Sequence, residues 1–188
     1  MRNFVGSALI LLLLVTAVAN LRAGTLAGVT LPDTVQAGST SLQLNGLGLR
    51  TKFMIKVYVA GLYLPQKSSD ANAILHPDAA KQIVMHFVRD VTKNQLTDGF
   101  ADSFHNNTPD AEKSLKSEVD RFFAALQSVK EGEEITLTYV PEKGTSVIIA
   151  GKEKLIINGP AFAEMLFSVW LGDKPPNAAL KKGLLSQL

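Results

Sequence analysis

After a first apolar block, apolar and polar residues alternate in several short segments of the chain. Successive side chains of a strand point to opposite faces, so a period of two predicts half-buried strands. The strands and extended segments predicted in this way are 28–35, 41–44, 81–91, 134–140, 145–150 and 153–157. The last three follow one another through tight turns, which predicts a β-meander.

Other segments carry apolar residues every three or four positions, a spacing that predicts helices. The clearest is 93–105, where Leu96, Phe100 and Phe104 form one apolar stripe behind Thr92, a residue suited to cap a helix. Further helices are predicted at 70–75, 109–126, 161–171 and 177–188.

The order of these elements is strands, two helices, three strands and two helices. Strands and helices are grouped rather than alternating one by one, which favours an α+β fold with an antiparallel sheet and helices on one face. No repeat, low-complexity segment or linker divides the chain after its first residues. We therefore expect one domain over residues 28–188.

The stretch Gly48–Leu64 is the strongest strand signal in the chain. It is rich in valine, isoleucine and aromatic residues and contains no proline before Pro65. It exceeds the length of a typical strand, so it predicts either one long central strand or a tight pair of strands. The preceding Asn45-Gly46 predicts a turn that ends strand 41–44.

Arg50 and Tyr58 are the polar residues of this stretch that could bind a ligand. A buried guanidinium needs an anion, and a nearby phenol can give the same anion a second hydrogen bond. On an unbroken strand both would share one face with Lys52 and Lys56, which instead favours a solvated face. Phe53, Ile55, Val57 and Val59 would then point to the other side.

The N-terminal segment has the pattern of a secretory signal peptide. Arg2 supplies a positive charge, and the apolar run 8–19 ends in Ala17-Val18-Ala19, small residues that suit cleavage before Asn20. Cleavage after Ala23 or Ala27 is an alternative. We expect residues 1–19 to be removed, the protein to be periplasmic or secreted, and no stable membrane span to remain, because the run is short for one. An uncleaved membrane anchor is the alternative.

Composition excludes several function classes. The formal charge is only +2 over 188 residues, and no basic cluster indicates nucleic-acid binding. The chain has no cysteine, and its three histidines are not at the spacing of metal ligands. It also lacks a nucleophile elbow and the glycine motifs of nucleotide binding. No metal or cofactor is therefore expected.

Several motifs, taken in order, resemble the chalcone isomerase-like superfamily. They are L-P-D-T-V, then G-L-G-L-R-T-K-F with K-V-Y-V-A-G-L-Y-L, then E-I-T-L-T-Y-V, and finally S-V-W-L-G-D-K-P-P. The resemblance covers residues 28–188 and is nearest to the bacterial, exported branch. It implies an open-faced β-sandwich of the chalcone isomerase type, in which a large antiparallel sheet and a helical layer enclose a ligand cleft.

The resemblance also implies which residues matter. Tyr58 stands where the isomerases have their catalytic threonine, Leu96 and Ser103 where they have a tyrosine and an asparagine, and Val169 near a polar specificity position. Most of the catalytic set is thus absent. The fatty-acid-binding branch uses an arginine and a tyrosine to hold a carboxylate, and Arg50 and Tyr58 match these two.

The expected function is a non-catalytic, periplasmic binding protein for an apolar ligand with an acidic head, such as a fatty acid. Arg50 would supply the cation, Tyr58 a hydrogen bond, and Leu96, Phe100 and Phe162 part of the apolar lining. Two alternatives stay open. One is an intramolecular lyase of the chalcone–flavanone isomerase type, and the other is a cell-envelope interaction protein that uses the fold as a scaffold.

Overall fold

The structure is a computed structural model and describes residues 23–187. The predicted signal peptide, residues 1–19, lies outside the described residues. The strands are β1 Ala23–Leu26, β2 Val29–Pro32, β3 Thr34–Ala37, β4 Thr40–Lys52, β5 Ile55–Leu64, β6 Lys81–Phe87, β7 Glu134–Val140, β8 Gly144–Ile149 and β9 Lys152–Ile157. The helices are α1 Ala71–Leu75, α2 Lys93–Asn107, α3 Pro109–Ser114, α4 Lys116–Ala125, α5 Pro160–Leu171 and α6 Ala178–Leu184.

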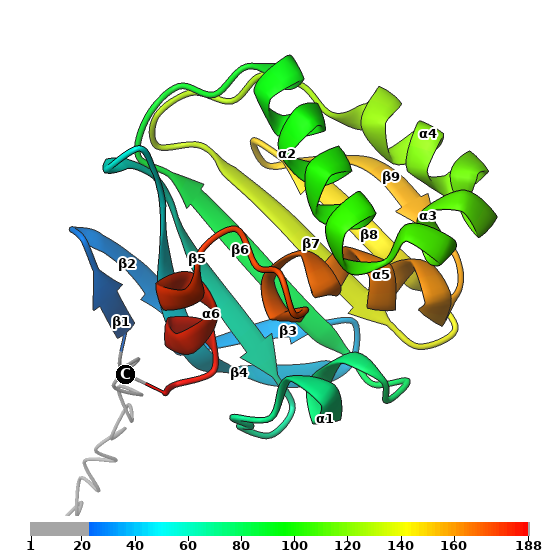
Figure 1. Cartoon of the computed structure of the whole chain (residues 1–188). Coiled ribbons are helices and arrows are strands. Elements are labelled where there is room, and N and C mark those ends of the chain that lie inside the picture. The colour runs from blue at the N-terminus through cyan, green and yellow to red at the C-terminus, as the bar shows by residue number, and fades with distance from the viewer. Residues whose placement is uncertain (1–22, 188) are drawn as a thin grey trace, which may run out of the picture.

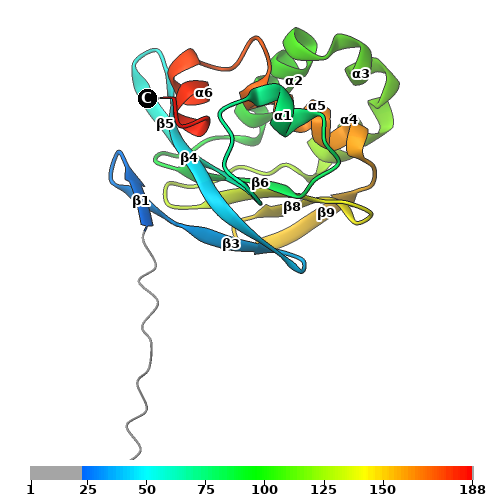
Figure 2. The ribbon, with the colours of Figure 1, turned by 90° about the horizontal axis from the view of Figure 1, so that it is seen from below.

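Seven strands form one antiparallel sheet in the order of the sequence, from β3 to β9. The helices lie on one side of this curved sheet, with α2 to α5 over its later strands and α6 over β4 and β5 (Figures 1 and 2). The separate hairpin β1–β2 packs on the other side through Val29 and Leu31. This arrangement confirms the α+β prediction and the open-faced β-sandwich.

The main core lies between the sheet and the helices. Alternate residues of β5, β6 and β7 point into it, including Leu62, Ile83 and Leu137, each without measurable exposure. Buried aromatic side chains of α2, α4 and α5 meet them from the other side, among them Phe100, Phe104, Phe122, Phe162 and Trp170. The predicted alternation of β6 and β7 and the predicted helical stripe of α2 are confirmed.

The predicted turn at Asn45-Gly46 is wrong, because β4 continues through both residues. Asn45 is the extra residue of a β-bulge between Leu44 and Gly46, and it is 2% exposed. Its side chain donates to the carbonyls of Ser68 and Leu184 at 2.9 and 2.8 Å and accepts from the Ser68 amide. A residue that favours turns therefore ties three segments together, since its short amide can satisfy backbone groups that a bulge exposes.

Of the two interpretations of Gly48–Leu64, the pair of strands is the observed one. The chain reverses at Phe53 and Met54, whose φ angles are 51° and 64°. On an unbroken strand, Phe53 and Ile55 would share the face of Val59. The reversal instead places both in solvent, with exposures of 86% and 50%.

Two predicted helices are shorter than the sequence pattern suggests. The long helix 109–126 divides at Leu115 into α3 and α4, and the last helix ends at Leu184. No helix within residues 23–187 combines the length and the apolar character that crossing a membrane requires.

Candidate functional site

Arg50 and Tyr58 lie directly opposite each other on β4 and β5. Opposite residues of an antiparallel pair project from the same face with Cβ atoms about 5 Å apart. Tyr58 belongs to the core between the sheet and the helices, so Arg50 also projects toward the helical side. The prediction of a solvated face is wrong for this pair: Tyr58 is 7% exposed and Arg50 is half-buried, whereas Lys52 and Lys56 are exposed.

Glycines bring α6 against β4 beside this pair. A Cβ atom on Gly48 would lie 2.4 Å from the Leu180 carbonyl oxygen, and one on Gly46 would lie 2.2 Å from that of Gly183. A Cβ on Gly183 would in turn meet the Leu47 carbonyl oxygen at 2.2 Å. The backbones of α6 and β4 can touch only because these positions have no side chain. This contact sets the loop before α6 over Arg50.

The loop before α6 holds the guanidinium through neutral acceptors. Arg50 Nη1 donates to the Pro176 carbonyl at 3.1 Å and to the carbonyl of its neighbour Thr51. Asn177 Nδ2 donates to Thr51 Oγ1 at 3.2 Å. Within residues 23–187, Arg50 forms no salt bridge. A guanidinium carries five N–H donors, so this cation keeps donors for a further acceptor.

Tyr58 contributes a second donor. Its hydroxyl accepts a hydrogen bond from Trp170 Nε1 at 3.0 Å, and its ring meets Phe87 edge-on with centroids 5.5 Å apart. Burial raises the pKa of Tyr58 to about 12, and the Trp170 hydrogen bond and the Arg50 charge oppose this only in part. The phenol is therefore protonated at neutral pH. In the described part of the chain, its proton has no acceptor.

The side-chain oxygen of Asn177, in the loop that contacts Arg50, has no hydrogen-bond partner among the described residues. This atom, Oδ1, is buried. Buried polar atoms are nearly always satisfied, and each exception requires an explanation. Arg50 and Tyr58 thus keep unmatched donors, and Asn177, directly before α6, keeps an unmatched acceptor.

The apolar lining expected for a ligand is present as packed side chains. Leu96, Phe100 and Phe162 are 6%, 4% and 1% exposed. Phe100 meets Phe122 edge-on at 4.9 Å and Trp170 at 6.0 Å between ring centroids. These rings occupy the space in which the resemblance implies a cleft. A pocket lined by Ala37, Val140 and Ile148 belongs to the opposite face of the sheet.

Three residues stand at positions where the resemblance implies polar residues of the isomerases, and none of them has a polar group free to bind a substrate. Leu96 and Val169 are buried apolar side chains. Ser103 Oγ donates to the Gly99 carbonyl at 2.8 Å, within its own helix. None of the three offers a free polar group to a phenolic substrate. Among residues 23–187, no three metal-binding side chains come together either.

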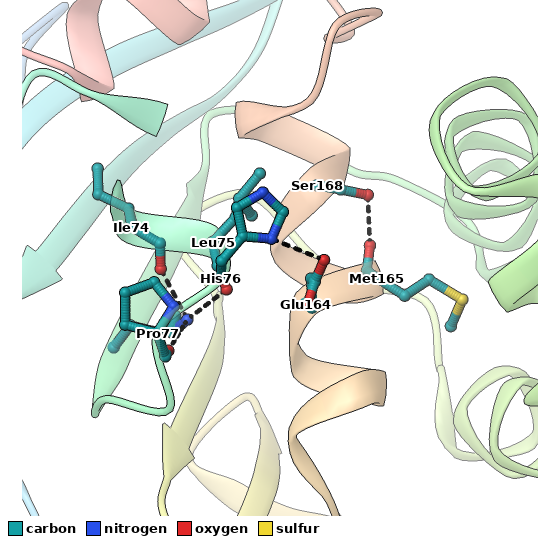
Figure 3. A network of polar contacts seen from close by, with 8 residues as sticks. Ile74, Leu75, His76, Pro77, Glu164, Met165 and Ser168 are labelled. Carbon is teal, nitrogen blue, oxygen red and sulfur yellow. Dashed lines mark hydrogen bonds and ion pairs between the residues drawn. The ribbon is translucent and has the colours of Figure 1, made fainter. Parts of the chain in front are cut away.

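A second buried cation, Lys81, lies on the same side of the sheet. Its ammonium donates to the carbonyls of Ile74, Leu75 and Pro77 at 2.7, 3.0 and 3.2 Å. Figure 3 shows these three carbonyls at and just after the end of α1. The ion pair of His76 and Glu164 lies close by, with 3.1 Å between His76 Nδ1 and Glu164 Oε1. Burial lowers the pKa of Lys81, while the charges of Glu164 and Asp78 act against this shift.

The geometry defines a sheet-and-helix sandwich with a cation and a protonated phenol on the helix-facing side of its first long hairpin. The sequence profile of the chalcone isomerase-like family matches residues 23–186, and the chain belongs to that family. Its fold resembles the crystal structure of a fatty-acid-binding protein from Arabidopsis thaliana, with a TM-score of 0.66 and 17% identity. That match covers 88% of this chain and 97% of the plant protein. A comparison with curated proteins finds no matching sequence.

Sequence reasoning named Arg50 and Tyr58 but missed the groups that hold them. Trp170 is the only tryptophan of the chain, and a buried indole N–H needs an acceptor, so a partner for it was a reasonable expectation. The identity of that partner was not predictable, because Tyr58 is 112 positions away. The Pro176 carbonyl, 126 positions from Arg50, leaves no signal in side-chain patterns.

Proposed function

We propose that this protein is a non-catalytic binding protein for an apolar ligand with an acidic head, such as a fatty acid. The observation that carries the proposal is the pair of unmatched donors, the Arg50 guanidinium and the Tyr58 phenol, side by side against the apolar core. A carboxylate would accept from both, and such charge-assisted hydrogen bonds are the strong ones. Arg50 and Tyr58 are the ligand-binding residues of the proposal.

The acyl chain would enter between the sheet and the helices beside Phe100 and Phe162. Because aromatic rings fill this layer, the ligand has to displace side chains there, and the free protein is the closed form. Binding would then replace contacts among protein side chains by contacts with the ligand, so the charged head contributes much of the net affinity.

A titration with a fluorescent fatty acid, cis-parinaric acid, tests the proposal on delipidated protein. Arg50→Gln should weaken binding roughly 10- to 100-fold, the effect of one charged hydrogen bond. Lys56→Gln is the matched control, because Lys56 is an exposed cation of the same hairpin. Hexadecanol, which has no charge, should compete equally well with both variants. Unchanged affinity in Arg50→Gln, or an equal loss in Lys56→Gln, contradicts the role of Arg50.

A second candidate function is a cell-envelope interaction protein that uses the fold only as a scaffold. The filled aromatic layer favours it, since a scaffold needs no cleft. Mass spectrometry of lipid extracted from the purified protein separates the two. A stoichiometric fatty acid supports the binding protein, and its absence, together with no cis-parinaric acid binding, supports the scaffold. Chalcone cyclisation faster than the spontaneous rate contradicts both and supports the isomerase alternative.

We further propose that the protein is exported and cleaved after Ala19. The pairing of β1 with β2 supports this cleavage point over the later ones, because β1 begins at Ala23. Cleavage after Ala27 would remove the whole of β1. N-terminal sequencing of protein from a periplasmic fraction should begin at Asn20. A first residue of Gly28, or recovery of the full chain from the cytoplasm, contradicts the proposal.

A further inference from the structure

The turn between β4 and β5 carries large apolar side chains that the fold does not bury. Phe53 is 86% exposed, Met54 98% and Ile55 50%. The turn lies at the margin of the molecule, where the cyan hairpin extends past α6 (Figure 2). Within the described residues, these three and Ile156 are the large apolar side chains with high exposure, and Ile156 lies far away on β9.

The backbone of this turn is unfavourable for the residues that occupy it. Phe53 and Met54 form a two-residue hairpin connection with φ angles of 51° and 64°. Left-handed angles at both positions are typical of a type I′ turn, for which Asn-Gly is the preferred pair. Bulky side chains rarely adopt them. The protein thus keeps Phe53 and Met54 where they are conformationally costly and contribute nothing to its own core, which points to a use outside the chain.

Charge and size indicate what covers the turn. Lys52 and Lys56 flank the apolar tip, both exposed and neither in a salt bridge within residues 23–187. Three large side chains offer about 500 Å² of contact, less than the roughly 800 Å² that each partner of a stable protein complex buries. A narrow apolar tip between two lysines instead suits a lipid surface, where rings and thioethers enter the acyl region and ammonium groups stay with phosphates.

We propose that the β4–β5 turn docks this protein on an anionic phospholipid bilayer, with Phe53 and Met54 inserted and Lys52 and Lys56 on the lipid phosphates. The inference does not depend on the proposed ligand site. It does place Arg50, three residues from Phe53 on the same hairpin, on the side of the molecule that faces the membrane.

Flotation with vesicles tests the docking site. The wild-type protein should float with vesicles of phosphatidylcholine and phosphatidylglycerol, and less with phosphatidylcholine alone. Phe53→Asn combined with Met54→Gly should weaken binding to the mixed vesicles about tenfold or more, because it removes the inserted side chains. The same pair suits the turn, so its melting temperature should equal or exceed the wild-type value. Loss of binding can therefore not be ascribed to unfolding.

Two further variants sharpen the result. Lys52→Gln with Lys56→Gln should weaken binding to the mixed vesicles roughly 25-fold, about fivefold per lysine, and leave binding to phosphatidylcholine unchanged. Ile156→Asn is the control and should bind as the wild type does. Wild-type protein that does not float, or a turn variant that floats as the wild type does, overturns the proposal. So does a wild-type dimer in sedimentation equilibrium that the turn variant lacks, because the occupant is then a second copy.

Discussion

Lys81 and Arg50 are two cations on the same side of the same sheet, but their hydrogen bonding differs. Lys81 is 2% exposed, and its ammonium has three carbonyl acceptors, one for each of its three donors. Arg50 is half-buried, and its two carbonyl acceptors are both bound by one nitrogen, Nη1. Lys81 is the more deeply buried of the two, yet it has nothing left to offer a ligand.

The comparison shows that donor satisfaction, rather than burial, separates a structural cation from a candidate binding cation. Two of the acceptors of Lys81, the carbonyls of Ile74 and Leu75, belong to the last turn of α1, where a helix leaves carbonyls unpaired, and an ammonium is well suited to them. The Arg50 guanidinium lies beside the loop before α6, and in that loop the amide oxygen of Asn177 is buried without a hydrogen-bond donor among the described residues. Lys81 should therefore affect stability, and Arg50 should affect ligand affinity.

Lys81→Met is expected to have the largest effect on stability. The change leaves buried carbonyls at the end of α1 without a donor, and such groups cost about 1–3 kcal/mol each, so a loss of about 3 kcal/mol is expected. Urea denaturation measures it. Lys152→Met, at an exposed position of β9, should change stability by less than about 0.5 kcal/mol. Equal effects of the two substitutions would remove the structural role of Lys81.

Gly48→Ala should have the next largest effect, and it acts on the frame of Arg50. The new methyl group would lie 2.4 Å from the Leu180 carbonyl oxygen, so α6 and the loop before it must move. The expected cost is about 2 kcal/mol, with weaker fatty-acid binding. Gly99→Ala in α2 is the matched control: a methyl group there meets nothing within 4 Å, and stability should rise slightly. A neutral Gly48→Ala would refute the close contact.

Tyr58→Phe should have a smaller effect that depends on pH. At pH 7 the loss of the hydroxyl leaves Trp170 Nε1 without an acceptor, which costs about 1–2 kcal/mol. The pKa of Tyr58 is about 12 in the folded protein, above the ordinary 10.0. The stability that comes from this shift is therefore complete below pH 10 and is lost as the pH rises toward 12.

The advantage of the wild type over Tyr58→Phe should consequently shrink by about 1 kcal/mol between pH 9 and pH 11. Urea denaturation at the two pH values measures the change, and the other tyrosines are common to both proteins and cancel. An advantage that stays constant or grows between these pH values would mean that the phenol is not buried in the protonated form.

Arg50→Gln should have the smallest effect on stability, below about 0.5 kcal/mol, because a partly solvated side chain with neutral acceptors contributes little. The same substitution has the large effect on fatty-acid affinity described above. Lys81→Met should therefore lose more stability than Arg50→Gln, and Arg50→Gln should lose more affinity for the fatty acid than Lys81→Met. A loss of stability in Arg50→Gln as large as that of Lys81→Met would end the distinction between the two cations.

Local patterns predicted much of the fold. The alternation in β7 and the stripe of Leu96, Phe100 and Phe104 in α2 report which side of each element is buried, and these predictions are confirmed. The grouping of strands and helices was enough for the α+β class. The pattern failed where a single residue changes the geometry. Asn45 suits a turn and forms a bulge, and Phe53-Met54 suits a strand and forms a turn.

The sequence by itself determined that this chain forms a large antiparallel sheet covered by helices, and it identified Arg50 and Tyr58 as a possible pair. Only the tertiary structure decided which way the pair points and what holds it. The bulge at Asn45 and the reversal at Phe53 set the register, and Trp170 and Pro176 approach from more than 100 residues away. The periodicity of a segment indicates which of its side chains are buried. Hydrogen-bond partners come from segments far apart in the sequence, so only the folded structure identifies the partners of Arg50 and Tyr58.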